Sequence, residues 1–436
     1  MITEALLHHI WRLQWFNTTN LTTTQGAPIV VLHPGHWNQN EGPDFLHATL
    51  LIHEIEWHGH VELHLKSAHW HAHKHDQNKA YDNVVLHVVW EDNQPILYKD
   101  QTPLPALVLQ NRVDTTLVTC CQALHTRSAP IPCGNQWASV PTDTKQAMLY
   151  EVLLERIQQK RVRVTRLLED NQGDWEEACY QLLAYSFGLK PNEEAFLALS
   201  QVLPWSILKR YAPHLFQLEA LLFGTAGLCP NNSQNDAYIQ ELLQEHRYLV
   251  QKHPMLSEAQ LHPSWYFSKL RPAHFPTIRL AQFAGLLHRM PCFFDAFLTE
   301  EVSLLRNQFR VTQSAYWQTH YVPNKPVATT IPGIGMATAD KILINAVVPF
   351  LVAYGQYKGD GRYAERAVHM LRSLPAEKNH MLVDWTRIGV SAKNAFDGQA
   401  LMQLYKQFCK NKASLSCRIG TKLLQPREKG KYMSKL

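Results

Sequence analysis

Hydrophobic and polar positions change their period several times in the first hundred residues. Leu6, Ile10 and Leu13 recur at helical spacing, which predicts an amphipathic helix over residues 2–16. Strand-like runs follow at 29–32, 45–52, 55–66 and 84–90. The last run is continuously apolar, as is typical of a strand buried on both faces. A polar segment, 67–82, precedes it and has room for a short helix. The expected order is therefore α-β-β-β-α-β.

Helical periodicity dominates the rest of the chain. Proline and glycine punctuate segments with apolar residues at helical spacing, at 145–168, 174–188, 192–201, 205–223, 236–250, 276–289, 294–309, 338–354, 360–373 and 396–409. We therefore predict an α+β protein with a mixed-sheet domain at 1–135 and a large all-α domain at 140–410. Residues 411–436 are expected to form a basic tail.

Composition excludes several classes of protein. The chain has 436 residues, of which 45% are hydrophobic, so it is long and apolar enough for two or three folded domains and is not intrinsically disordered. No apolar run reaches about 18 residues, and the N-terminus lacks the basic and apolar regions of a signal peptide. We expect no membrane span. Eight cysteines without a signal peptide suggest free thiols and a cytoplasmic location.

Charge and histidine are distributed unevenly. Residues 1–100 hold 14 of the 24 histidines, with 11 Asp+Glu against 5 Lys+Arg, a balance of −6. Since the whole chain carries +5, the remaining residues carry +11. This asymmetry fits a metal-binding N-terminal domain beside a body that binds a polyanion. A moderately basic soluble protein with a solvated tail fits the same charges.

The strand-like run 55–66 carries the most informative pattern. Its polar residues alternate with apolar ones and so share one face, comprising Glu56, His58, His60, Glu62, His64 and Lys66. A solvated face is ordinarily filled with Thr, Ser and Lys, whereas Glu and His favour metal binding or acid–base chemistry. The alternative is a solvated strand at the edge of the sheet.

Asp44 begins the preceding strand and extends this pattern. An antiparallel hairpin centred on His53 places Asp44 opposite Glu62, where two carboxylates can share a divalent cation. A two-residue turn at 53–54 pairs Asp44 with Leu63 instead, and a bulge at Gly59 would also change the register.

These residues resemble the motif of one enzyme family. Pro43-Asp44 followed by Glu62-x-His64, within the predicted order of elements, is similar to the PD-(D/E)xK nucleases and their restriction-endonuclease-like fold. The resemblance implies that Asp44 and Glu62 bind Mg²⁺ or Mn²⁺ and that the chain hydrolyses phosphodiester bonds of DNA or RNA. The family has a catalytic lysine where this chain has His64, with Lys66 two residues later, and we assign the proton-handling role to either. Because degenerate members of such folds lose catalysis, a non-catalytic nucleic-acid-binding or scaffold protein is the first alternative.

The chain also resembles, across nearly its full length, a bacterial family that is known as a domain of unknown function. The similar stretches are GPDF at 42–45, W-x-G-x-V-E-x-H at 57–64, Trp70-x-x-His73-x-His75, YDNVVLHVV at 81–89 and QALMQLYKQFC at 399–409. This resemblance brings no activity with it.

The remaining histidines of the N-terminal region suggest a second alternative. His69, His71, His73 and His75 alternate around Trp70, and imidazole suits zinc, nickel or iron, as in a His-rich metallohydrolase of another substrate. We nevertheless expect Mg²⁺ or Mn²⁺, because no cysteine spacing supports a zinc site. The candidates for supporting the metal ligands or contacting substrate are Glu41, His60, His73, His75 and His87. His87 lies in the apolar run, where a hydrogen-bonded core histidine is the alternative.

Nucleic acid is the partner that we expect for the helical region. The segment 331–342, IPGIGMATADKI, resembles a helix-hairpin-helix turn, in which the amides of Gly333 and Gly335 approach a phosphate and Lys341 adds charge. A glycine-rich helix junction is the alternative. Arg161 lies in a predicted helix rich in basic residues, which serve either phosphate contact or solvation. The oligomeric state is left open.

Overall fold

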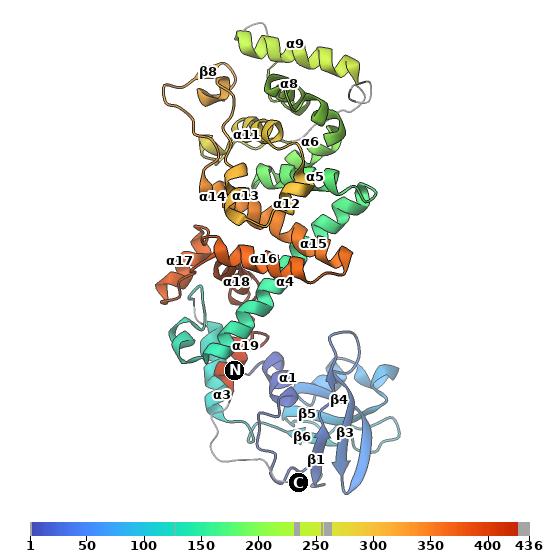
Figure 1. Cartoon of the computed structure of the whole chain (residues 1–436). Helices are drawn as coiled ribbons and strands as arrows, with labels where there is room; N and C mark the ends of the chain where they lie inside the picture. The colour runs from blue at the N-terminus through green and yellow to red at the C-terminus, as the bar shows by residue number, and fades with distance from the viewer. Residues whose placement is uncertain (1, 127, 231–235, 254–255, 257–263, 426–436) are drawn as a thin grey trace. The chain divides into compact units, whose positions relative to one another are not determined.

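Two compact units make up the chain (Figure 1). In this computed structural model, residues 2–126, 128–230, 236–253, 256 and 264–425 are described. The first unit comprises Met1–Met148, Asp384–Gly389 and Leu404–Leu436. The second comprises Leu149–Val383 and Val390–Gln403. Short segments from the C-terminal part of the chain therefore belong to the same unit as the N-terminal sheet.

A mixed β-sheet is the centre of the first unit. Its strands are β1 (Ile29–His33), β2 (His36–Trp37), β3 (Phe45–Ile52), β4 (Ile55–Lys66), β5 (Val84–Glu91) and β6 (Ala106–Val108). The order across the sheet is β1-β3-β4-β5-β6, with β2 paired to β3. The β1–β3 and β3–β4 pairs are antiparallel, and the β4–β5 and β5–β6 pairs are parallel. β4 thus lies inside the sheet from His60 onward, and the edge-strand alternative for 55–66 is wrong there, whereas residues 55–58 pair only with β3 and are exposed.

Helix α1 (Glu4–Arg12) covers one face of this sheet (Figure 1). The Thr3 side chain caps the helix by accepting the amide N–H of Leu6 at 3.3 Å. The buried face of α1 consists of Leu6, Leu7, Ile10 and Trp11. These side chains share a large core with Val61 and Leu63 of β4. Because successive side chains of a strand alternate, Glu62 and His64 lie on the opposite face.

Other helices complete the first unit. They are α2 (His69–Ala72), α3 (Thr115–Thr126), α19 (Arg418–Leu424), and the 3₁₀ turns η1 (His75–Gln77), η2 (Lys79–Tyr81) and η3 (Gly134–Ser139). Leu415 and Leu424 are buried in the same core as α1, so the expected basic tail does not begin at residue 411. The apolar positions of 415–424 pack on the first unit, and residues 426–436 lie outside the described part of the chain.

The chain between residues 142 and 409 is largely helical, as the periodicity predicts. Its α-helices are α4 (Thr142–Asp170), α5 (Trp175–Gly188), α6 (Glu193–Val202), α7 (Trp205–Leu208), α8 (Leu215–Ala226), α9 (Ala237–Lys252), α11 (Pro276–Arg289), α12 (Phe293–Phe297), α13 (Val302–Gln308), α14 (Met336–Ile342), α15 (Val348–Lys358), α16 (Arg362–Ser373), α17 (His380–Arg387) and α18 (Ala395–Leu404). Short turns are η4 (Lys209–Tyr211), η5 (Pro272–His274), η6 (Tyr316–Gln318), and the π-helical η7 (Leu343–Val347) and η8 (Tyr405–Cys409). A small hairpin of β7 (His320–Val322) and β8 (Lys325–Pro326) interrupts them.

One helical stretch, Met336–Lys358, is long and apolar enough to cross a membrane by length and composition alone. Its most apolar window is 67% buried within the structure. Burial among neighbouring helices accounts for that composition, as in the core helix of a globular domain.

Candidate metal centre

The β3–β4 hairpin contains both registers that the sequence left open. His53 and Glu54 form a two-residue turn with φ angles of 50° and 66°, which pairs Ile52 with Ile55. The register then shifts between Phe45 and Ala48. Two residues of β3 oppose one of β4 there, so the bulge lies on β3 and not at Gly59. Beyond it Phe45 pairs with Val61, which brings Asp44 alongside Glu62.

Glycine is needed at position 59 for close packing between strands and not for a bulge. A Cβ atom at this position would lie 2.4 Å from Val85 Cγ1 and 2.6 Å from the carbonyl oxygen of Asn83. Glycine therefore permits the start of β5 to approach β4 closely. The parallel pair that results places Glu62 in register with His87.

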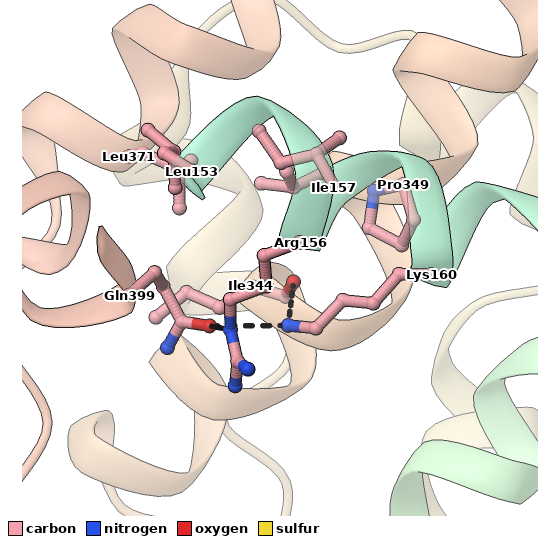
Figure 2. A pocket seen from close by; sticks show the side chains of 9 residues that line it. Leu153, Arg156, Ile157, Lys160, Ile344, Pro349, Leu371 and Gln399 are labelled. Carbon is pink, nitrogen blue, oxygen red and sulfur yellow. Dashed lines mark hydrogen bonds between the residues drawn. The ribbon is translucent and has the colours of Figure 1, made fainter. Parts of the chain in front are cut away.

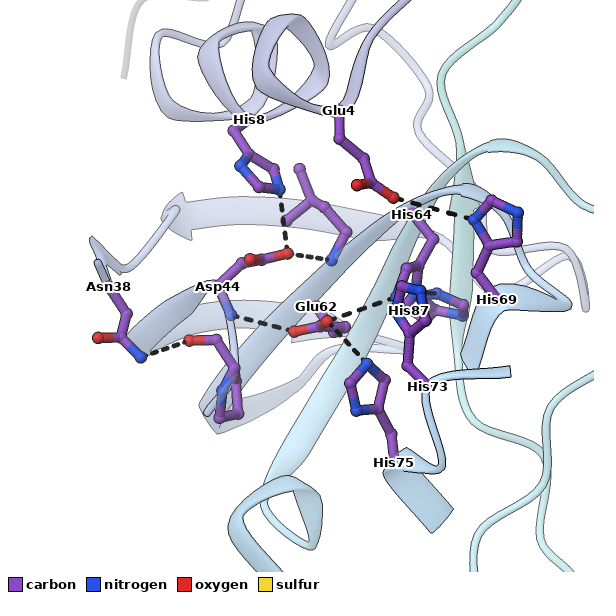
Figure 3. Close-up of polar contacts among 12 residues, drawn as sticks. Glu4, His8, Asn38, Asp44, Glu62, His64, His69, His73, His75 and His87 are labelled. Carbon is purple, nitrogen blue, oxygen red and sulfur yellow. Dashed lines mark hydrogen bonds and ion pairs between the residues drawn. The ribbon is translucent and has the colours of Figure 1, made fainter. Parts of the chain in front are cut away.

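Asp44 and Glu62 are locked together through the backbones of their strands (Figure 3). The amide N–H of Asp44 donates to Glu62 Oε2 at 3.0 Å, and the amide N–H of Leu63 donates to Asp44 Oδ2 at 3.0 Å. Each carboxylate thus uses one oxygen to bind the opposite strand. The expected juxtaposition of these two acids is present in the structure.

His8 is a neighbour of this pair that the sequence analysis missed. Its Nε2 lies 3.1 Å from Asp44 Oδ2. Burial lowers the pKa of His8, but the contact with Asp44 and other nearby carboxylates outweigh burial, so that the pKa is raised overall. The sequence could have indicated a role for His8, because Glu4 and His8 are four residues apart and share one face of the predicted helix.

Imidazoles surround the other oxygen of Glu62 (Figure 3). Glu62 Oε1 lies 3.2 Å from His75 Nε2 and 3.6 Å from His64 Nε2. His64 Nε2 in turn lies 3.1 Å from His73 Nδ1. The ligand atoms of His64, His73 and His75 all fall within 4.8 Å of one another. We call these three histidines with Glu62 the imidazole cluster.

Burial shifts the pKa values of Glu62 and His64 in the imidazole cluster and of the neighbouring His87. His64 is 2% exposed, and burial together with the surrounding imidazoles lowers its pKa to about 2. Burial raises the pKa of Glu62, as does Asp44, while His75 and the Asp44 amide oppose the rise. Burial also lowers the pKa of His87 to about 3. Neutral imidazoles have a free lone pair, which is the form that binds a metal.

The other proposed site residues of the first unit lie apart from this cluster. Lys66 is half exposed at the end of β4, where its Nζ lies 3.9 Å from Glu91 Oε2. The Glu41 side chain is exposed. His60 lies opposite the β3 bulge and accepts the amide N–H of His47 at 3.3 Å. Of His64 and Lys66, the two candidates for the role of the family's lysine, only His64 is therefore beside Glu62.

The four residues expected to contact nucleic acid differ in their surroundings. Arg161 Nε donates to Gln158 Oε1 at 2.7 Å. A Cβ on Gly333 would lie 2.4 Å from the Val311 carbonyl oxygen, so close packing requires this glycine, whereas a Cβ on Gly335 meets nothing within 4 Å. Lys341 lies on α14 near His274, whose pKa it helps to lower after the larger effects of burial and Arg279.

Two further basic residues of α4 point into a small pocket of the second unit (Figure 2). Arg156 Nε donates to Gln399 Oε1 at 2.6 Å, and Lys160 Nζ donates to the same oxygen at 3.2 Å. Lys160 also donates to Asn345 Oδ1 at 2.9 Å. The basic composition of α4 thus partly reflects internal hydrogen bonding.

Fold and site together define an α+β protein with a buried carboxylate–imidazole cluster on its N-terminal sheet. The chain belongs to the family described as "Protein of unknown function (DUF2851)", whose model matches residues 4–380. That range includes the sheet, the imidazole cluster and most of the helical region. No curated protein and no solved structure matches the chain.

Proposed function

We propose that the protein is a metal-dependent nuclease that hydrolyses phosphodiester bonds of DNA or RNA at Asp44 and Glu62. The observation that carries this proposal is the reciprocal locking of the two acids across β3 and β4. The antiparallel β3–β4 pair, the parallel β5 and the covering helix α1 agree with the restriction-endonuclease-like arrangement that the sequence motif suggested.

The donor set fits a divalent cation. Asp44 and Glu62 each accept a backbone N–H with one carboxylate oxygen. Among the described residues, the other oxygen of Asp44, Oδ1, has no hydrogen-bond partner. Carboxylate oxygens suit Mg²⁺ and Mn²⁺. A cation bound there supplies a water of lowered pKa and neutralises charge on the phosphate.

The protein's own groups position this chemistry. The amide hydrogen bonds hold both carboxylates at the β3–β4 junction. His64 stands where the nuclease family has lysine, with its Nε2 3.6 Å from Glu62 Oε1. His8, which is partly buried, lies 3.1 Å from Asp44 Oδ2, and, against the opposing effect of burial, the hydrogen bond and charge of Asp44 raise its pKa. The charge of +11 outside residues 1–100 supports a polyanionic substrate.

A cleavage assay tests this proposal. The purified full chain is incubated with labelled single-stranded DNA, duplex DNA and RNA, with Mg²⁺ or Mn²⁺ and with a chelator. We expect metal-dependent cleavage that Asp44→Asn and Glu62→Gln each reduce at least about 100-fold. Glu54→Gln is the matched control, because Glu54 lies in the turn between the same two strands and is exposed. Absence of cleavage with both metals, or full activity of Glu62→Gln, would overturn the proposal.

A non-catalytic nucleic-acid-binding protein is the second candidate. The observation that favours it is the replacement of the family's lysine by a neutral, buried His64, with Lys66 beside Glu91. Binding that weakens steeply with salt and persists in chelator, without any cleavage, would support this candidate.

The imidazole cluster favours a third candidate, a His-rich metallohydrolase of another substrate. His64, His73 and His75 offer nitrogen ligands that phosphodiester hydrolysis with Mg²⁺ does not require. Hydrolysis of small ester or phosphomonoester substrates without nucleic-acid cleavage would support it.

A further inference from the structure

We infer that Glu62, His64, His73 and His75 form a four-ligand centre for a transition-metal dication of the zinc class, on the Oε1 side of Glu62. This inference goes beyond the proposed nuclease function, because it concerns a different kind of ion and three residues that the nuclease motif does not use. It stands or falls by metal binding, whether or not the protein cuts nucleic acid.

The spacing of the donor atoms matches a tetrahedral ion. With zinc–ligand bonds of about 2.0–2.1 Å, neighbouring ligand atoms of a tetrahedron lie roughly 3.3–3.4 Å apart. Three distances between ligand atoms of the cluster are close to this value. His64 Nε2 lies 3.1 Å from His73 Nδ1 and 3.6 Å from Glu62 Oε1, and His75 Nε2 lies 3.2 Å from Glu62 Oε1. The ligand atoms of the three imidazoles lie within 4.8 Å of one another, and Glu62 Oε1 adjoins those of His64 and His75, so one ion would draw these side chains together.

Local structure explains why these four side chains converge. Glu62 and His64 are two residues apart on β4, so they share a face. His73 ends helix α2 and His75 begins the turn η1, with Lys74 between them in the left-handed region at φ 59°. That turn brings the His75 imidazole to Glu62 and the His73 imidazole to His64. His71, in contrast, is exposed on α2 and lies 3.9 Å from Asp76.

A polar atom in the cluster lacks an ordinary partner. His75 is 9% exposed, and its Nε2 makes no aligned hydrogen bond within the described part of the chain, although Glu62 Oε1 is 3.2 Å away. A buried ring nitrogen that faces a carboxylate without an aligned hydrogen bond costs free energy. Coordination of an ion between His75 Nε2 and Glu62 Oε1 removes this cost.

His87 completes the arrangement from the neighbouring strand. His64 Nδ1 lies 2.9 Å from His87 Nε2, and His87 is fully buried on β5. When His64 Nε2 binds an ion, Nδ1 carries the hydrogen and donates it to His87 Nε2. Metal-bound histidines ordinarily donate their second ring N–H to such an acceptor. His87 therefore fixes the orientation of His64.

Aromatic packing holds the third imidazole. The His75 ring stacks on Tyr81 with centroids 3.8 Å apart, and Trp70 meets it edge-on at 5.4 Å. Rings that are held in this way lose little side-chain entropy when an ion binds. The ligand set contains three imidazoles and one carboxylate, which favours zinc, Co²⁺ or Ni²⁺ over Mg²⁺. His73, which is exposed, leaves a route for the ion from solvent.

Cobalt titration of the metal-stripped full chain tests the inference. We expect one equivalent of Co²⁺ to bind with the intense visible absorption of a tetrahedral site, zinc to displace it, and a large excess of Mg²⁺ to leave it in place. His75→Gln and His73→Gln should each weaken binding at least about 100-fold, because losing a ligand costs no less than losing a supporting contact. His73 is exposed, so His73→Gln is the variant that preserves the fold most securely.

Two control variants separate loss of this metal site from other effects. His71→Gln changes a histidine of the same segment outside the cluster and should bind Co²⁺ as the unaltered protein does. Asp44→Asn should keep Co²⁺ binding while losing any nuclease activity, so the two proposals fail separately. Binding that is weak, not stoichiometric, or unchanged by both His73→Gln and His75→Gln would overturn the inference.

Discussion

Glu62 on β4 and His87 on β5 stand opposite each other in register across a parallel strand pair, both buried in the sheet. A carboxylate and an imidazole in the interior of a sheet are costly unless each has a partner. His64, two residues after Glu62, is that shared partner, at 3.6 Å from Glu62 Oε1 and 2.9 Å from His87 Nε2.

Changing His87 should weaken metal binding without touching a ligand. We expect His87→Leu to lower the affinity for Co²⁺ about 10- to 100-fold, because His64 loses the acceptor that orients its ring. His87→Gln keeps an acceptor oxygen and should retain more of the affinity. Equal affinities for His87→Leu and the unaltered protein, in the same Co²⁺ titration, would mean that His87 is only a core residue.

Metal should stabilise the first unit through Glu62. An ion at 100 times its dissociation constant adds about 2.7 kcal/mol to the free energy of unfolding. We therefore expect zinc to raise the melting temperature of the first unit, as followed by calorimetry, and Glu62→Gln to abolish the rise. His58→Gln, an exposed histidine on the same strand, is the control and should keep it. A rise that survives in Glu62→Gln would place the ion elsewhere.

Lys66 should contribute little to catalysis. Its ammonium is half exposed and lies near Glu91 at the far end of β4, and exposed ion pairs contribute about 0–1 kcal/mol. We expect Lys66→Ala to change the cleavage rate less than about 3-fold, whereas His64→Ala abolishes cleavage. If Lys66→Ala loses activity while its melting temperature is unchanged, Lys66 and not His64 has the catalytic role.

The second unit should show a pH dependence that arises from Glu219. This carboxyl is 1% exposed, bonded by the Tyr238 hydroxyl, and burial raises its pKa from 4.5 to about 7. The unfolded chain releases the proton near pH 4.5, while the folded unit keeps it until about pH 7. Stability from the protonated group is thus complete below the lower value and declines by up to about 1.4 kcal/mol per pH unit between the two.

Glu219→Gln removes this titration. Urea unfolding of both proteins between pH 4 and 8 should show the unaltered protein losing stability relative to Glu219→Gln up to about pH 7, with a constant difference above it. Parallel curves over the whole range would show that Glu219 ionises normally.

Gly333 and Gly335 should respond differently to a side chain. Gly333→Ala forces a Cβ against the Val311 carbonyl oxygen and should cost about 1–3 kcal/mol in urea unfolding. Gly335 caps α14 in open space, so Gly335→Ser should change stability by less than about 0.5 kcal/mol. If Gly335→Ser lowers the affinity for nucleic acid without changing stability, the turn binds phosphate. If the affinity is unchanged, the segment is only a junction between helices.

The strands of the site follow from the sequence, but the register does not. The alternation of polar and apolar residues over 55–66 and the apolar run before it give β3 and β4 with their observed ends. The bulge beside His47 depends on a left-handed backbone at a non-glycine residue, with φ 56°, which no local pattern predicts. Because of that bulge, the two-residue turn at 53–54 and the pairing of Asp44 with Glu62, which the sequence presented as alternatives, both occur.

The choice among the histidines also required tertiary structure. The sequence leaves room for a short helix in 67–82, but it does not indicate which of the four histidines at 69, 71, 73 and 75 the helix and the following turn bring to the cluster. Only the left-handed Lys74 brings His73 and His75 together. His8 was overlooked because its role depends on how α1 packs against β4.

Anomalous X-ray scattering from crystals grown with zinc can locate a divalent ion bound at Glu62. We expect one strong anomalous peak about 2.0–2.2 Å from Glu62 Oε1 and from the nearest nitrogens of His64, His73 and His75. Crystals of His75→Gln should lose that peak under the same conditions. No peak at Glu62, with zinc found only on exposed histidines such as His58 or His71, would contradict the account.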